Sequence, residues 1–108
     1  AYAPYSNFSV GAAVDGDDGK VYTGCNVENG SYGLTSCAER NAVFAAVAAG
    51  CRKIHSVVVV ADEDYTLPCG ACRQVLAEFS AERIILTAKD GRYRVVKATE
   101  LFPQPFSL

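Results

Sequence analysis

The stretch His55–Ala61, HSVVVVA, decides the fold class, because it contains four consecutive valines. A continuous β-branched run of this length is typical of a central strand that is covered on both faces. In the following segment, 69–82 (CGACRQVLAEFSAE), apolar residues recur every four positions, which predicts a helix. Two further strands are expected at 83–88 (RIILTA) and 93–98 (YRVVKA), with a KDGR turn between them and a short helical turn at TELF after them.

The segment before the valine run predicts a hairpin and a helix. Strands are expected at 8–14 and 20–27, on either side of the DGDDG turn cluster. The clearest helix is 36–50 (SCAERNAVFAAVAAG), where Ser36 and Glu39 fit a capping box. Almost every residue after Asn41 is apolar, so we expect this helix to be buried against other subunits. The order β-β-α-β-α-β-β predicts an α/β fold with a mixed sheet and layered helices.

Composition excludes several classes of protein. The 108 residues are expected to form a single domain, 1–108, with a net charge of −2. The basic residues are scattered, which argues against binding a long nucleic acid. No apolar run is long enough for a membrane span, so we expect a soluble, cytoplasmic protein. Five cysteines is an odd count, which favours a metal site or catalysis over a fully paired secreted scaffold.

Three cysteines stand at predicted helix starts: Cys37 at the first, and Cys69 and Cys72 at the second. If both helices follow strands of one sheet, the three thiols can converge, and the positive helix ends favour thiolates. Three protein ligands leave a fourth tetrahedral position open, as in a catalytic zinc site. His55, Cys25 and Cys51 are not expected to be ligands. A redox pair or a structural zinc site remains an alternative.

Charged residues accompany these cysteines. Glu39 lies two residues after Cys37, where both side chains can point past the helix end. A carboxylate beside a metal site can accept a proton from water and pass it on. Arg40 directly follows Glu39, and Arg73 directly follows Cys72. We expect both guanidinium groups to hydrogen-bond thiolate sulfur and so to reduce its negative charge.

These residues give the chain a resemblance to the cytidine deaminases of the short, homotetrameric type with three zinc-binding cysteines. The resemblance runs through PYSNFSVGAAV, GCNVENGSYGLTSCAERNAV, PCGACRQV and ELFPQPF, in that order. It implies a three-layer α-β-α fold with a mixed central sheet, and one Zn²⁺ per chain held by the three cysteines at 37, 69 and 72. It also implies that the carboxylate at position 39 is the proton shuttle.

The same resemblance implies how a nucleoside substrate is bound. Asn26 and Glu28 would hold the sugar 3′-hydroxyl, Phe8 would pack near the pyrimidine, and the Ala38 N–H would meet the base carbonyl. The ring of Tyr32 and that of Phe106 would reach a neighbouring subunit's site, which implies a homotetramer with shared sites. Physical chemistry agrees with the sugar contacts, because a hydroxyl both donates and accepts hydrogen bonds.

The function expected on this basis is zinc-dependent hydrolytic deamination of cytidine and 2′-deoxycytidine, with release of ammonia. One alternative is a deaminase that acts on a cytosine-containing antibiotic or a modified nucleoside. Another is a structural zinc or Cys-x-x-Cys redox module, and a weaker one is nucleic-acid editing, for which the acidic chain offers no phosphate track.

Overall fold

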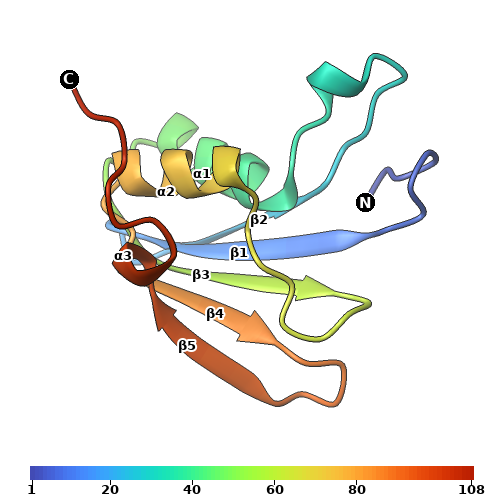
Figure 1. Cartoon of the computed structure of the whole chain (residues 1–108). Helices are drawn as coiled ribbons and strands as arrows, with labels where there is room; N and C mark the ends of the chain where they lie inside the picture. Colours follow the sequence, from blue (N-terminus) through green and yellow to red (C-terminus); the bar gives the residue numbers. More distant parts are fainter.

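The computed structural model describes all 108 residues and confirms the predicted order of strands and helices (Figure 1). A 3₁₀ turn, η1, is added in the loop before the first helix. The elements are β1 Val10–Gly16, β2 Val21–Cys25, η1 Tyr32–Leu34, α1 Ala38–Ala48, β3 Ile54–Ala61, α2 Gly70–Glu78, β4 Arg83–Thr87, β5 Tyr93–Lys97 and α3 Ala98–Leu101.

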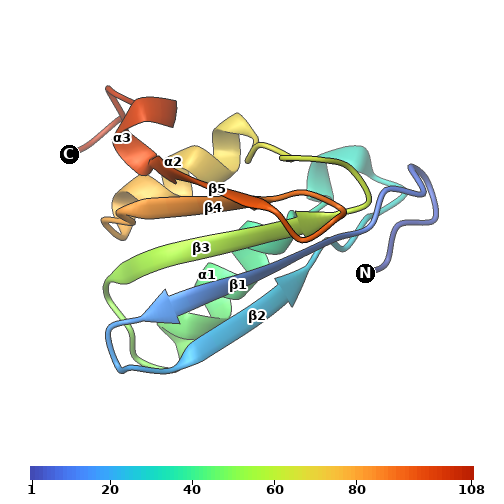
Figure 2. The same cartoon turned by 90° about the horizontal axis from the view of Figure 1, so that it is seen from below.

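The five strands form one mixed sheet in the order β2-β1-β3-β4-β5, which Figure 2 shows from below. The valine run is the central strand, as predicted. β3 and β4 pair in parallel, with Val57 opposite Ile84, whereas the other neighbours pair antiparallel. A parallel pair needs a crossover connection, and α2 provides it.

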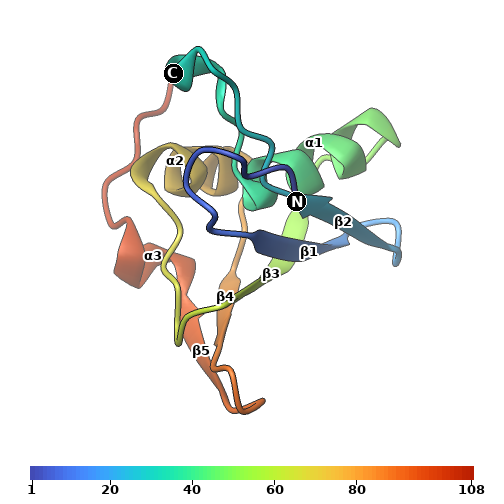
Figure 3. The same ribbon diagram turned by 90° about the vertical axis from the view of Figure 1, so that its right-hand side faces the viewer.

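All three helices lie over the same face of the sheet (Figures 1 and 3). The hydrophobic core lies between that face and the helices, and it includes Val57 and Val59 of β3. The opposite face is open to solvent in the isolated chain, since Val60 is 53% and Val95 54% exposed. The α/β class and the mixed sheet are therefore confirmed. Of the three layers in the predicted α-β-α arrangement, this chain by itself forms two, because its helices cover the valine strand on one face only.

Small residues let α1 lie directly on the sheet. The helix buries Ala38, Ala42 and Ala46, so its axis can approach the strands closely. At the contact with β2, a Cβ added to Gly24 would lie 2.5 Å from both the Ala38 carbonyl oxygen and the Ala42 nitrogen. Only glycine fits there without a shift of α1, and this contact sets the height of the helix above the sheet.

The helix starts differ from the predicted ones by one or two residues. The N-caps are Cys37 for α1 and Cys69 for α2, and neither makes a side-chain capping bond. The predicted Ser36–Glu39 capping box is wrong. Ser36 instead pairs with Val27 in a β-bridge, and its hydroxyl donates to Asn41 Oδ1 at 2.7 Å. The sulfurs of Cys37 and Cys69 therefore lie at the helix starts without a capping bond and are available to bind a metal ion.

Helix length and polarity also bear on membranes. None of the helices combines the length and the apolar character that a membrane crossing requires.

Candidate active site

Three cysteine sulfurs meet where α1 and α2 begin. The metal-ligating atoms of Cys37, Cys69 and Cys72 all lie within 4.8 Å of one another, and the first two sulfurs are 3.7 Å apart. Zn–S bonds of about 2.3 Å in a tetrahedron place sulfurs roughly 3.8 Å apart, so the three thiols fit zinc. No other histidine, cysteine or carboxylate belongs to the group, so the cluster has three protein ligands and leaves one tetrahedral position open.

The two helix ends give the three thiols different environments. Burial, followed by the charge of Glu39, raises the pKa of Cys72, which is fully buried. The pKa of Cys69 is lowered: burial opposes this, but hydrogen bonds from Cys72 and from backbone N–H groups at the start of α2 outweigh it. The exposed Cys69 thiol therefore loses its proton more readily than the buried Cys72 thiol. The Cys72 thiol becomes a thiolate only beside a strong positive charge, such as a metal ion.

Glu39 is a buried carboxyl group beside this cluster. It is 5% exposed, and burial raises its pKa above the usual value for a glutamate. The same raised pKa is typical of carboxyl groups that exchange protons during catalysis. The Cys72 thiol partly offsets this rise in the pKa of Glu39, and the charge of Glu39 in turn raises the pKa of Cys72, so the carboxyl group lies close to the sulfur cluster.

Arg40 provides the positive charge next to the thiols. Its Nη2 lies 3.3 Å from Cys37 Sγ and 3.4 Å from the carbonyl oxygen of Thr35. The hydrogen bond to Cys37 is the main reason that the pKa of Arg40 is raised further. This contact is the one predicted from the sequence, and it lets the guanidinium offset part of the negative charge on sulfur.

Arg73 does not have the predicted contact with sulfur. Its Nε donates to the Pro68 carbonyl at 2.8 Å, and its Nη1 donates to the Leu101 carbonyl at 2.9 Å. The guanidinium therefore reaches back to the residue before Cys69 and across to the end of α3, and it makes no hydrogen bond to sulfur. Arg73 therefore connects the loop before α2 to the end of α3.

Asn26 and Glu28 both hold the N-terminal segment, residues 5–10. The buried Asn26 amide accepts from the Val10 N–H at 2.9 Å and donates to the Phe8 carbonyl at 2.8 Å. One amide proton of Asn26 takes no part in these two bonds. The segment that carries the Phe8 ring is thus fixed in part by the residue expected to bind the sugar.

Glu28 holds the other half of this segment. Its Oε1 accepts from the Tyr5 and Ser6 N–H groups at 2.9 and 3.2 Å, and its Oε2 accepts from the Ser6 hydroxyl at 2.6 Å. The Ser6 hydroxyl, followed by these N–H groups, lowers the pKa of Glu28. The residue is half-buried, and these three hydrogen bonds leave one of about four acceptor sites of the carboxylate for a further donor.

Two aromatic residues expected to reach a neighbour point outward from the chain. Tyr32 is 76% exposed in η1 and stacks edge-on against Tyr5, with ring centroids 5.9 Å apart. Phe106 is 70% exposed in the C-terminal segment, which Figure 1 shows on the opposite side of the molecule. Within one chain the two rings are therefore far apart, and Phe106 does not approach the loop that carries Tyr32.

Three structural side chains were missed from the sequence. Asn41 donates to the Cys25 carbonyl at 2.7 Å and accepts from Ser36, which ties α1 to the end of β2. Ser6 connects Glu28 to the Phe8 N–H, and Gln74 pairs with the backbone of Phe106. Of these three residues, only Asn41 could have been noticed in the sequence, because it is a single amide side chain just before the apolar part of α1.

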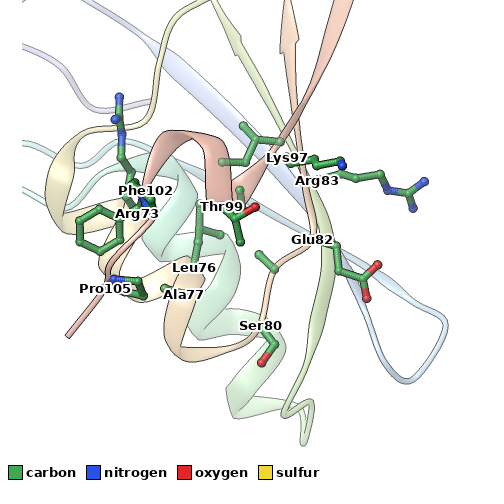
Figure 4. Close-up of a pocket in the computed structure, with 14 residues that line it drawn as sticks. Arg73, Leu76, Ala77, Ser80, Glu82, Arg83, Lys97, Thr99, Phe102 and Pro105 are labelled. Carbon is green, nitrogen blue, oxygen red and sulfur yellow. The ribbon is translucent and has the colours of Figure 1, made fainter. Parts of the chain in front are cut away.

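A cavity of about 580 Å³ lies apart from the cysteines, between α2, α3 and the C-terminal segment (Figure 4). Leu76 of α2 and the rings of Phe102 and Pro105 are among the residues that line it. None of the three clustered cysteines and no predicted substrate contact lines this space. It is therefore a second feature of the surface, distinct from the candidate active site.

Comparison with known proteins agrees with the geometry. Residues 1–88 match the family model described as the cytidine and deoxycytidylate deaminase zinc-binding region. The cytidine deaminase of Sporosarcina psychrophila is 48% identical over 110 aligned positions, covering 99% of this chain and 81% of the relative.

Solved structures give the same result. The crystal structure of cytidine deaminase from Burkholderia pseudomallei is 51% identical, with a TM-score of 0.90 over 97% of this chain and 87% of that one. That of Mycobacterium tuberculosis is 43% identical, with a TM-score of 0.85 over 100% of this chain and 86% of that one. With its sulfur cluster, buried glutamate and paired arginine, the chain belongs to the family of cytidine and deoxycytidylate deaminases that have a zinc-binding region.

Proposed function

We propose that this chain catalyses the hydrolytic deamination of cytidine and 2′-deoxycytidine to uridine and 2′-deoxyuridine. The observation that carries the proposal is the convergence of three thiols and one buried carboxyl group at two helix starts. In this assignment Cys37, Cys69 and Cys72 hold one Zn²⁺. When bound, zinc supplies Lewis acidity that makes water a nucleophile near neutral pH.

Glu39 moves the protons. Its carboxylate accepts a proton from water and delivers it to ring N3, the water oxygen bonds to C4, and the C4–N4 bond breaks. The second water proton passes through the same carboxylate to the leaving nitrogen, which departs as ammonia. The raised pKa of Glu39 favours this exchange, because the carboxyl group holds a proton more readily than an exposed glutamate would.

The chain's other residues bind and orient the nucleoside. Ala38 opens α1, where backbone N–H groups lack an intrahelical acceptor, so its N–H is available to the base carbonyl. The remaining amide proton of Asn26 and a lone pair of Glu28 suit the sugar 3′-hydroxyl, which both accepts and donates. The Phe8 ring supplies a flat apolar surface for the pyrimidine.

We further propose a homotetramer with shared sites. Phe44 on α1 is 49% exposed, and it lies on the outer side of a helix whose remaining surface is largely alanine and valine. Tyr32 and Phe106 are exposed as well, and an exposed aromatic side chain is typical of an interface. Light scattering on the purified protein tests this directly, and an active monomer would contradict it.

The decisive experiment combines zinc analysis with an absorbance assay on one sample. The zinc-loaded protein should convert cytidine, and Glu39→Gln should keep zinc while turnover falls by about 10²–10⁴-fold. Glu78→Gln, at an exposed position at the end of α2, is the matched control and should be fully active. A zinc-loaded protein that leaves cytidine unchanged would reject the proposal, and full activity in Glu39→Gln would reject the role of the glutamate.

A further inference from the structure

The side chain of Gln74 on α2 forms a two-bond pair with the backbone of Phe106. Its Nε2 donates to the Phe106 carbonyl at 3.0 Å, and its Oε1 accepts from the Phe106 N–H at 3.1 Å. One amide thus satisfies both backbone groups of one residue, as a neighbouring strand would. Such a pair fixes the orientation of the Phe106 backbone as well as its distance from α2.

The neighbouring helix residue holds the other end of the same segment. Arg73 donates to the Leu101 carbonyl at 2.9 Å, so two consecutive side chains of α2 hold the chain at positions 101 and 106. Pro103 and Pro105 lie between these points, and proline restricts the backbone. Residues 102–106 therefore form a strap across the cavity of Figure 4. The strap contains no regular structure, but both of its ends are held by side chains of α2.

The restraint on Phe106, the last residue of the strap, serves no packing role within this chain. Phe106 is 70% exposed, so the Gln74 pair does not hold its ring in the core of this chain. An aromatic ring on a restrained backbone loses little entropy when it enters a partner's pocket. Restraint of an exposed ring is useful where a second copy of the chain receives it.

We propose that Gln74 is a positioning residue that holds Phe106 in the direction needed to enter the partner subunit's nucleoside site. This inference rests on the shared-site assembly of the proposed function. Gln74 has no contact with substrate and acts only through Phe106. Its loss should weaken substrate binding while zinc content and the chemical step stay unchanged.

A double-mutant cycle tests this in the zinc-loaded enzyme with cytidine as substrate. Gln74→Ala should raise KM about 3- to 10-fold with kcat unchanged, as expected for loss of one or two hydrogen bonds. Phe106→Ala should raise KM at least as much, and the double variant should be no worse than Phe106→Ala alone. Gln74→Glu, which keeps the acceptor and loses the donor, should resemble Gln74→Ala.

The controls separate positioning from general loss of structure. Gln104 is also a glutamine, it lies within the strap, and its side chain makes no hydrogen bond. Gln104→Ala should therefore leave KM unaltered. Hydrogen exchange at the Phe106 amide should be faster in Gln74→Ala than in the parent protein. Exchange that is unchanged would overturn the inference.

The remaining outcomes are also decisive. Additive effects of Gln74→Ala and Phe106→Ala would show that Gln74 acts through something else, which overturns the inference. A silent Phe106→Ala in an enzyme that deaminates cytidine would overturn it too, but would leave the deaminase function intact. A parent protein with no turnover at all would instead reject the proposed function.

Discussion

Gly24→Ala is the substitution that most directly tests how the sheet positions the active site. The new Cβ would lie 2.5 Å from the Ala38 carbonyl oxygen and the Ala42 nitrogen, whereas ordinary contacts begin near 3.4 Å. Both neighbours are backbone atoms, so no side-chain rotation relieves the overlap. The start of α1 must therefore move by about 1 Å away from β2, at a cost of roughly 1–3 kcal/mol.

The displacement should affect catalysis as well as stability. Ala38 lies between Cys37 and Glu39, so a shift of its carbonyl moves one predicted zinc ligand and the predicted proton carrier together. A misplacement of about 1 Å at a catalytic group can cost on the order of 10²-fold in rate. Urea unfolding should give the loss of free energy, and the cytidine absorbance assay should give the loss of kcat.

Gly11→Ala is the matched control for this prediction. Gly11 lies on the neighbouring strand β1, and a Cβ there would have nothing within 4 Å. The control should change stability by less than about 1 kcal/mol and leave kcat unaltered. A Gly24→Ala protein with the parent's free energy of unfolding and kcat would refute the argument that this glycine sets the helix position.

Three further predictions concern side chains around the site. Arg40→Leu removes the guanidinium group that hydrogen-bonds the Cys37 sulfur, and it should lower zinc affinity about 10- to 100-fold. A competition titration with a chelator measures this affinity, and an unchanged value would contradict the role of the Arg40–Cys37 contact. Asn41→Ala leaves the Cys25 carbonyl without its donor and should cost about 1–3 kcal/mol in urea unfolding, and a loss near zero would contradict that estimate. The lowered pKa of Glu28 stabilises the fold above its ordinary value of 4.5, and this contribution disappears as pH falls through the lowered pKa. The stability difference between the parent and Glu28→Gln should therefore shrink from about pH 6 to pH 3.5, and a constant difference would show that the Ser6 contact has no linked effect.

The regular part of the fold could be predicted because its signals are local. Four consecutive valines indicate a buried strand, and the four-residue spacing of Ala71, Val75 and Phe79 indicates a helix, whatever the rest of the chain does. The positions of three cysteines at two helix starts then followed from connectivity, since both helices come after strands of one sheet. Their approach to within 4.8 Å confirms that inference.

The irregular segments could not be predicted in the same way. Arg73 follows a cysteine just as Arg40 follows Glu39, yet only Arg40 hydrogen-bonds sulfur. The guanidinium of Arg73 instead donates to the backbone carbonyls of Pro68 and Leu101, and the location of these two groups depends on the tertiary fold. The capping box failed for a related reason: a β-bridge to Val27 already holds Ser36 in extended backbone.

The site thus combines two kinds of support, and they should respond differently to substitution. The zinc-binding thiols and Glu39 stand on helices packed against a rigid sheet, so changes there should alter metal content or kcat. Phe8 and Phe106 lie on irregular segments, which are held by the side chains of Asn26 and Gln74 through backbone hydrogen bonds. Such bonds contribute about 1 kcal/mol each and leave the chemistry untouched, so changes there should appear mainly in KM. We therefore expect substitutions in these two segments of this chain to change nucleoside binding before they change the deamination step.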